Sequence, residues 1–490
     1  MEVTAVASNP LAAGVDTLIV SLFERGNTPS GVTGTLDRKL GGVIGELMAA
    51  GDVSGRAEEV SVLYPRGAVA ATRVLIVGLG PANTFGSEAV RRASAVAGRR
   101  ARELGARKVA SVAHGAGVSG LSLGEAAQAT VEGTRLGLYR FGEDAGIESF
   151  TLMEEDPGKL DALRDGVRWG DAVAEGASLA RDLVNRPANV ATPEHLAEIA
   201  QGLARDHGFR VSIGDRAWAE SEGMGAFLAV ARAAGHEPRF ITLEHDPSGG
   251  KEAPLVIVGK GITFDSGGLS IKGRQGLESM KQDMAGAAAV LGVMRVIGRL
   301  RSPRRVVALV PATENVIDAF GYRPSDVLTA ADGTTIEVIS TDAEGRLILA
   351  DALVYAKRFK PRAVVDLATL TGAVDVALGN VAAGLFCNDD ALADALASSA
   401  TRTFERAWRL PLWPEYVRVL ESDVADLKNS SGKPSGGACV AAGFLERFTS
   451  YPWAHLDIAG VRAVDSTEGY KVKGSTGFGV RLLADWVTRS

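Results

Sequence analysis

The stretch TTIEVISTDAEGRLILADAL, residues 334–353, changes from a strand pattern to a helix pattern along its length. Ile336, Val338 and Ile339 form a short apolar run of β-branched residues, and the final residues are apolar at helical spacing. Open α/β sheets bind ligands at such strand-to-helix junctions, beyond the carboxyl ends of the strands. The stretch therefore predicts an α/β fold with a binding site at this turn.

The turn itself carries Asp342, Glu344 and Arg346. Asp342 and Glu344 are two residues apart, so in an extended chain their carboxylates point to the same side. Paired carboxylates suit a divalent cation. The same two residues are equally compatible with a helix start, where Asp342 caps the helix and Glu344 favours its N-terminus. The turn alone leaves metal binding and helix capping open.

Composition narrows the class of protein. The 490 residues, 46% hydrophobic and 23% charged, fit a globular chain with more than one core. A net charge of -6 argues against non-specific nucleic-acid binding as the main activity. Cys387 and Cys439 are the only cysteines, which excludes a disulfide framework and favours the cytoplasm. The sequence shows no signal peptide and no apolar run long enough to span a membrane.

The pattern along the chain predicts an α/β domain over residues 1–160, a charged connecting helix over 161–185 and a larger domain over 186–490. In the first domain we expect a helix over 87–104 and strands at 17–22, 60–63, 74–77 and 109–112. In the larger domain the expected strands are 211–213, 240–243, 255–258, 306–309, 335–339 and 363–367. Long helices separate several of them, so we expect a mostly parallel central sheet flanked by helices.

The sequence predicts a glycine-rich loop over residues 259–272, which follows one of these strands and contains Lys260, Asp265 and Lys272. Its four glycines allow the backbone to fold tightly around a ligand. The charged residues are also compatible with a surface ion-pair cluster of little energetic value. The segment lacks the spacing of a phosphate-binding Walker loop.

Two further segments complete the set. Residues 280–286 lead into a helix of small residues, and Asp283 is most simply an N-cap there. Residues 367–373 form a Thr/Gly turn at a strand end, either an ordinary connection or a place where backbone groups meet a ligand.

Three of the four polar segments follow a strand of the proposed sheet, and the Asp283 segment opens the helix after the glycine-rich one. Parallel strands bring their carboxyl ends to one edge. The side chains expected to converge there are Lys260, Asp265, Asp283, Asp342 and Glu344. Four carboxylates in one cleft repel each other, which favours two bound divalent cations. The six histidines show no zinc-binding spacing.

The segments VGKGITFDSGGLSIK, MKQDMAGAAAV, STDAEGRL and LATLTGA resemble, in this order and spacing, the motifs of the leucyl (cytosol) aminopeptidase family. The resemblance covers the C-terminal two-thirds of the chain. It implies a metal-dependent enzyme that hydrolyses the N-terminal peptide bond of peptides through a metal-bridging water, with a preference for leucine and other neutral residues. One departure is Ser340, where the family usually has Asn, which puts one hydrogen bond near the site in question.

The resemblance also implies the metal ligands. Two ions per subunit, Mn²⁺ or Zn²⁺, would be held by Lys260, Asp265, Asp283, Asp342 and Glu344. An amine must be neutral to bind a metal, so we expect Lys260 to be buried with a lowered pKa.

By the same resemblance, Lys272 would polarise the scissile carbonyl and Arg346 would hold a bicarbonate that acts as general base. The implied substrate-binding residues are Lys272, Met280, Asp283, Thr369, Leu370 and Gly372. The family is typically a homohexamer, with an N-terminal domain that contributes to assembly. The main alternative is a DNA-binding regulator on the same scaffold, supported by an arginine-rich stretch at residues 91–107. A third hypothesis is another two-metal hydrolase, such as a phosphatase, but it does not explain why Lys272 and Arg346 occur at these positions.

Overall fold

The computed structural model describes residues 1–24, 26 and 28–489. The chain forms two compact units. The first contains Met1–Ala174 and Asp465–Lys473, and the second contains Glu175–Val464 and Gly474–Ser490. Among the described helices, none combines the length and the hydropathy that crossing a bilayer requires.

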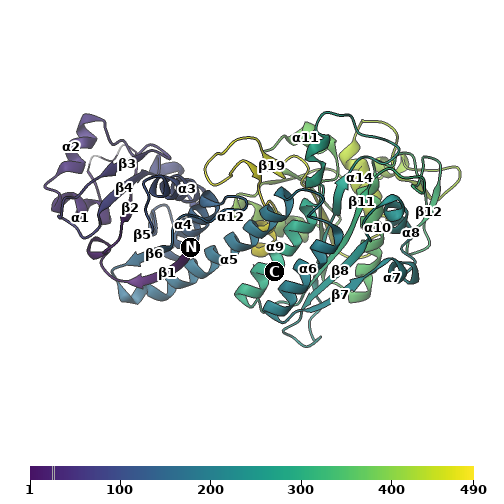
Figure 1. The fold of residues 1–490 in the computed structure, drawn as a ribbon, viewed down its shortest axis with the longest axis horizontal. Coiled ribbons are helices and arrows are strands. Elements are labelled where there is room, and N and C mark those ends of the chain that lie inside the picture. Colours follow the sequence, from purple (N-terminus) through teal and green to yellow (C-terminus); the bar gives the residue numbers. More distant parts are fainter. Residues whose placement is uncertain (25, 27, 490) are drawn as a thin grey trace. The chain divides into compact units, whose positions relative to one another are not determined.

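The first unit is a six-stranded sheet with helices on both faces (Figure 1). All neighbouring strands are parallel except β3, which runs antiparallel to β4. The strands, in spatial order, are β1 (Glu2–Ala7), β6 (Ser149–Glu154), β5 (Lys108–Ser111), β2 (Thr17–Leu22), β4 (Arg73–Gly78) and β3 (Val60–Leu63). The helices are α1 (Gly31–Lys39), α2 (Val43–Ala50), α3 (Ser87–Glu103), α4 (Leu123–Leu138) and α5 (Leu160–Asn185), the last continuing into the second unit.

Successive side chains of β2 point to opposite faces of the sheet, which explains why a layer of helices packs on each face. Ile19 packs with α3 and α4 on one face, whereas Leu18 and Val20 pack with α1 and α2 on the other. A strand buried on both faces reads as a continuous apolar run, which made β2 and β4 predictable. Strands β1 and β6 were not predicted, because polar residues interrupt their apolar runs.

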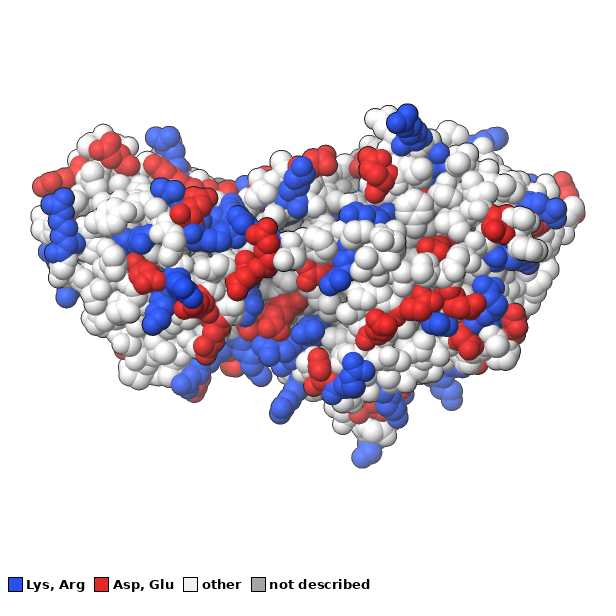
Figure 2. Space-filling view, in the orientation of Figure 1, with Lys and Arg blue, Asp and Glu red and all other residues white. Residues whose placement is uncertain are grey.

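Arginines of α3 are bound within the first unit. The buried Arg91 lies 2.6 Å from Glu132 of α4, and Arg92 lies 2.6 Å from Glu58. Figure 2 shows Lys and Arg side chains interspersed with Asp and Glu over the face that it presents. Arg91 and Arg92 therefore serve internal packing, whereas Arg100 and Arg107 are exposed and each pairs with a glutamate.

The segment 465–473 comes from late in the sequence but belongs to the first unit. Arg92 pairs with Glu468 at 2.9 Å, and Arg99 donates a hydrogen bond to the carbonyl oxygen of Gly469. The short strands β19 (Ala463–Val464) and β20 (Gly474–Ser475) pair antiparallel at the base of this excursion.

The second unit is built on a sheet of nine described strands. Its centre, β18–β14–β9–β11, is parallel, and antiparallel pairs occur toward the edges. The strands are β7 (Arg210–Gly214), β8 (Arg239–His245), β9 (Leu255–Gly259), β10 (Gly261–Asp265), β11 (Val306–Asn315), β14 (Ala363–Ala368), β15 (Ala383–Cys387), β16 (Ala407–Arg409) and β18 (Trp453–Asp457). The predicted class, an N-terminal α/β domain and a larger domain with a mostly parallel, helix-flanked sheet, is confirmed.

Helices cover both faces of this sheet (Figure 1). The core of one face includes α8, α10 and α14, whose apolar residues pack on β9 and β11. On the other face α9 packs against β9 and β14, with α6 and α15 beside it. The helices of this unit are α6 (Pro193–His207), α7 (Arg216–Ser221), α8 (Gly225–Val230), α9 (Ala285–Leu300), α10 (Glu344–Ala356), α11 (Gly372–Leu378), α12 (Asp390–Thr403), α13 (Pro414–Arg418), α14 (Gly437–Glu446) and α15 (Val480–Arg489).

Two predictions about strands in this unit were wrong. The strand expected at 335–339 is β13 (Thr335–Glu337), and it lies in a separate small sheet between β12 (Val327–Thr329) and β17 (Leu427–Lys428). The glycine-rich segment is not all loop, because its first part is β10, which pairs in parallel with the far end of β11. The extra length of β11, ten residues, provides that second partner.

The close packing of the first turn of α9 against the sheet predicts how two glycine substitutions change the free energy of unfolding. A Cβ on Gly286 of α9 would lie 2.1 Å from the carbonyl oxygen of Leu367, so Gly286→Ala should lower the free energy of unfolding by about 1–3 kcal/mol. A Cβ on Gly202 of α6 would meet no atom closer than 3.8 Å apart from the adjoining backbone of its own helix, so Gly202→Ala should raise the free energy of unfolding by up to about 1 kcal/mol. Urea unfolding of both variants checks the difference, and equal effects would contradict this packing.

Candidate metal centre

Separate segments of the second unit bring acidic side chains to one edge of the sheet. Asp265 ends β10, Asp283 follows the 3₁₀ helix η5 (Leu277–Gln282), and Glu344 is the first residue of α10. Lys260 occupies the single position between β9 and β10. The predicted convergence is therefore present, although the segment with Glu344 follows a strand of the small sheet.

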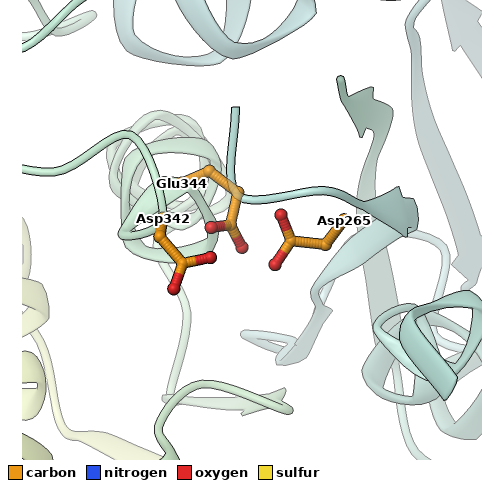
Figure 3. Close-up of side chains that lie close together, drawn as sticks. All are labelled: Asp265, Asp342 and Glu344. Carbon is orange, nitrogen blue, oxygen red and sulfur yellow. The ribbon is translucent and has the colours of Figure 1, made fainter. Parts of the chain in front are cut away.

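Three carboxylates form a compact group. Oxygen atoms of Asp265, Asp342 and Glu344 all lie within 4.8 Å of one another, and Figure 3 shows the three groups gathered in one place. Asp265 and Glu344 are buried, whereas Asp342 is exposed. The group thus has an inner part within the core and an outer part open to solvent.

Two lysines separate these carboxylates. Lys260 Nζ lies 2.7 Å from Asp283 Oδ2 and 2.7 Å from Glu344 Oε1. Lys272 Nζ lies 2.8 Å from Asp265 Oδ2 and also pairs with Asp342. Each ammonium group therefore bridges two carboxylates and offsets their mutual repulsion.

The helix-capping alternative fails for both aspartates. The N-cap of α10 is Ala343 and that of α9 is Met284, and neither helix has a side-chain cap. Asp283 instead accepts a hydrogen bond from Thr369 Oγ1 at 2.7 Å. Both aspartates face the shared site and leave the helix ends uncapped.

Burial sets the ionisation of the group. It raises the pKa of Glu344 to about 8 and that of Asp283 to about 6, with Asp265 adding to both shifts. Burial alone would lower the pKa of Lys260, but the negative charges of Asp283, Glu344 and Asp265 raise it above its usual value. The lowered pKa expected for Lys260 is therefore not found in the chain alone, and a bound metal would have to displace this proton.

Neutral side chains missed by the sequence analysis hold the carboxylates in place. Asn315, the last residue of β11, donates to Asp265 Oδ1 at 2.8 Å and to the carbonyl oxygen of Thr341 at 3.0 Å. The Tyr322 hydroxyl donates to the same carbonyl at 2.8 Å. Thr341 Oγ1 donates to the carbonyl oxygen of Gly267 at 2.6 Å. A polar residue closing an apolar strand was the available signal for Asn315.

Asn429 fixes the turn that carries Arg346. Its Oδ1 accepts from the backbone N–H groups of Ile339, at 2.7 Å, and of Ser340, while its carbonyl oxygen accepts from Arg346 Nη1 at 2.8 Å. Burial lowers the pKa of Arg346 to about 10, so the guanidinium stays charged near neutral pH. Ser340 Oγ accepts from the Asp342 N–H at 3.2 Å, so this shorter side chain still makes a hydrogen bond within the turn.

The remaining predicted positions adjoin this group to different degrees. Thr369 contacts it directly, because its carbonyl oxygen accepts from Lys260 Nζ at 3.0 Å. Leu370 is partly buried, and Gly372 begins α11 and is exposed. Met280 lies in η5 and is partly buried, three residues before Asp283.

The residues present fit divalent cations. Glu344 Oε2 is buried and has no hydrogen-bond partner in the part of the chain that the structure describes. Four carboxylates and one amine form a donor set of oxygen and nitrogen, which suits Mn²⁺ or Zn²⁺. The arrangement can therefore hold metal once the proton of Lys260 is displaced.

Comparison with known proteins agrees with this chemistry. The model of the "Cytosol aminopeptidase family, catalytic domain" matches residues 178–484, and that of the family's N-terminal domain matches residues 19–143. The chain belongs to the cytosol aminopeptidase family. The family recognised from the sequence is thereby confirmed, and with it the class of enzyme, a metallo-aminopeptidase.

Relatives in the cytosol aminopeptidase family match along the full chain. A probable cytosol aminopeptidase of Roseiflexus castenholzii is 43% identical, covering 99% of both chains. A tomato leucine aminopeptidase mutant is similar in structure, with a TM-score of 0.87, 34% identity and coverage of 100% of this chain and 97% of that one. The bottromycin maturation enzyme BotP in complex with Mn has a TM-score of 0.86 and 35% identity, covering 97% and 99%. Nothing in these comparisons supports the DNA-binding alternative.

The raised pKa values predict how metal binding depends on pH. Below a pH of about 8, Glu344 carries a proton that a metal must displace, so the affinity for Mn²⁺ should fall as the pH is lowered. Isothermal titration of the metal-stripped protein in buffers of different ionisation enthalpy would measure both the affinity and the protons released. An affinity that stays constant from about pH 9 to about pH 6, with circular dichroism showing an intact fold, would contradict this account of the site.

Proposed function

We propose that this protein removes the N-terminal residue of peptides, preferring leucine and other neutral residues, with two divalent cations held by the carboxylate–lysine group. The observation that carries the proposal is the convergence of Asp265, Asp342 and Glu344 within 4.8 Å, beside Lys260 and Lys272. We found no observation that favours a phosphatase or a DNA-binding regulator over this function.

The ligands divide into two groups. Lys260, which contacts both Asp283 and Glu344, would hold the inner and tighter cation together with them, and Asp342 would hold the outer one. Asp265 and Glu344, which lie close to Asp342, would serve both cations. Cations bound there supply a water of lowered pKa and polarise the peptide carbonyl.

Lys272 is suited to stabilise the oxyanion of the tetrahedral intermediate. The carboxylates of Asp265, Glu344 and Asp342 outweigh the effect of burial and raise the pKa of Lys272, so its ammonium persists at neutral pH. About a quarter of its side chain is exposed, so the group can reach a substrate from the solvent side of the site. A fixed positive charge near a developing oxyanion lowers the barrier to attack.

Arg346 is suited to hold an anion that accepts a proton. Its Nε is buried and has no hydrogen-bond partner among the residues that the structure describes, while Nη1 is bound to Asn429. A bicarbonate paired with this guanidinium would be a planar, bidentate partner and a general base.

Substrate selection rests on the same edge of the sheet. Met280 and Leu370 offer partly buried apolar surface for a leucine side chain, and Thr369 and Gly372 adjoin them. The free α-amine of a peptide would occupy a metal position when the cations are bound, which accounts for cleavage at the N-terminus alone.

Assembly into a homohexamer in the cytoplasm is part of the proposal. Relatives named cytosol aminopeptidase support the compartment. Trp408 and Trp413 of the second unit are 66% and 60% exposed, and exposed aromatic surface of this kind is typical of subunit contacts. Light scattering on the purified protein would measure the mass of the assembly.

Metal removal tests the proposed activity. Chelation should abolish hydrolysis of a leucyl amide, and added Mn²⁺ or Zn²⁺ should restore it, because the carboxylates alone supply no nucleophile at neutral pH. Metal analysis of the same samples shows whether stripping was complete. Full activity in a protein free of metal would refute the proposal.

Replacing Lys272 tests its separate role. Lys272→Ala should lower kcat by roughly 100- to 1,000-fold while the protein retains its metal content. Lys251, which is exposed, provides the matched control, because Lys251→Ala removes the same charge elsewhere and should leave kcat unchanged. A Lys272→Ala protein that loses metal and activity in equal measure would place Lys272 in metal binding instead.

A further inference from the structure

Asp457 is a buried acidic residue that the proposed mechanism does not use. It ends β18, where it is paired in register with Ala368 of the parallel strand β14, and it is only 1% exposed. A carboxylate in such a place needs several donors, because an unsatisfied buried charge is costly.

Its donors all come from short turns that follow strands. Asp457 Oδ1 accepts from the backbone N–H groups of Leu370, at 3.1 Å, of Thr371, at 3.4 Å, and of Ala459, at 3.3 Å. Oδ2 accepts from the Thr371 hydroxyl at 2.6 Å. Three of these four bonds hold the turn formed by residues 369–372, so the carboxylate fixes both the backbone and a side chain of that turn.

The 369–372 turn also contacts Lys260 and Asp283 of the metal centre. The carbonyl oxygen of Thr369 accepts from Lys260 Nζ at 3.0 Å, and Thr369 Oγ1 donates to Asp283 Oδ1 at 2.7 Å. The donor Leu370 N–H is the next backbone amide after Thr369, so a shift of the turn moves both contacts. Asp265 and Asp342 make no such bond to this turn among the described contacts.

From this chain of contacts we infer that Asp457 is a positioning residue for the inner cation: it sets the 369–372 turn and, through Thr369, the orientation of Lys260 and Asp283. The inference rests on the proposed function, because it assigns a metal to these two residues. The two cation positions should therefore differ in how far they depend on Asp457, since only the inner position is supported by the 369–372 turn.

A purely structural role has to be distinguished from positioning. Thr371 Oγ1 also accepts from Val374 N–H and caps α11, so loss of Asp457 could act only through stability. Asp351 offers a matched control in the same unit: it is fully buried and accepts from the backbone N–H groups of Phe227 and Ala331, each at 2.8 Å. Its partners include none of the proposed metal ligands.

The test compares Asp457→Asn with Asp351→Asn by titrating Mn²⁺ into the full-length, metal-stripped proteins and by urea unfolding. We expect Asp457→Asn to weaken the tighter of the two binding events by roughly 10- to 100-fold. The looser event should stay unchanged, and Asp351→Asn should keep both affinities even if it is equally destabilised. Thr371→Val should weaken the tighter event less, and Thr371→Ser, which keeps the hydroxyl, should restore it.

Two results would overturn the inference: unchanged Mn²⁺ affinities in Asp457→Asn, or equal losses in Asp457→Asn and Asp351→Asn. Either would occur with a wild-type protein that binds two ions, so the proposed function would stand. A wild-type protein that binds neither Mn²⁺ nor Zn²⁺ would instead refute the proposed function itself.

Discussion

Electrostatic repulsion among carboxylates is the constraint on which the second unit depends. Four acidic groups meet at one edge of the sheet, and two lysines each bridge a pair of them. Removing one partner would leave a buried charge uncompensated, which costs several kcal/mol. In the chain alone the two ammonium groups offset only part of this negative charge. On the proposed function, metal binding would replace the Lys260 contact with a coordination bond.

Neutral hydrogen bonds give this charged group its shape. Asn315 ties β11 to Asp265 and to the turn before α10, and Asn429 holds the same turn from the other side. The proposed ligands come from segments that belong to different sheets, so these hydrogen bonds set distances between them that the geometry of one sheet cannot. They lie behind the ligands, where a site needs rigid support.

Much of the fold and the convergence of the polar segments could be predicted from the sequence because the deciding features are local. Buried strands such as β9 and β14 are continuous apolar runs, and the proposed ligand residues lie in distinctive polar segments. What escaped prediction depends on tertiary partners. The sequence of a short strand such as β13 does not indicate which sheet it joins. Asp283 fits a helix cap in sequence, and its hydrogen bond with Thr369 is known only from the structure. The pKa of Lys260 depends on neighbours that are distant in sequence.

The excursion of residues 465–473 has a consequence for synthesis of the chain. The first unit includes this segment, whose Glu468 pairs with Arg92. On a ribosome the N-terminal residues emerge early, yet their unit receives its last piece only when nearly the whole polypeptide has been translated. Domains generally fold as units during synthesis, so here the first unit can be completed only after most of the second has been translated. A gene fragment that ends before this segment would encode an N-terminal unit lacking one of its own parts.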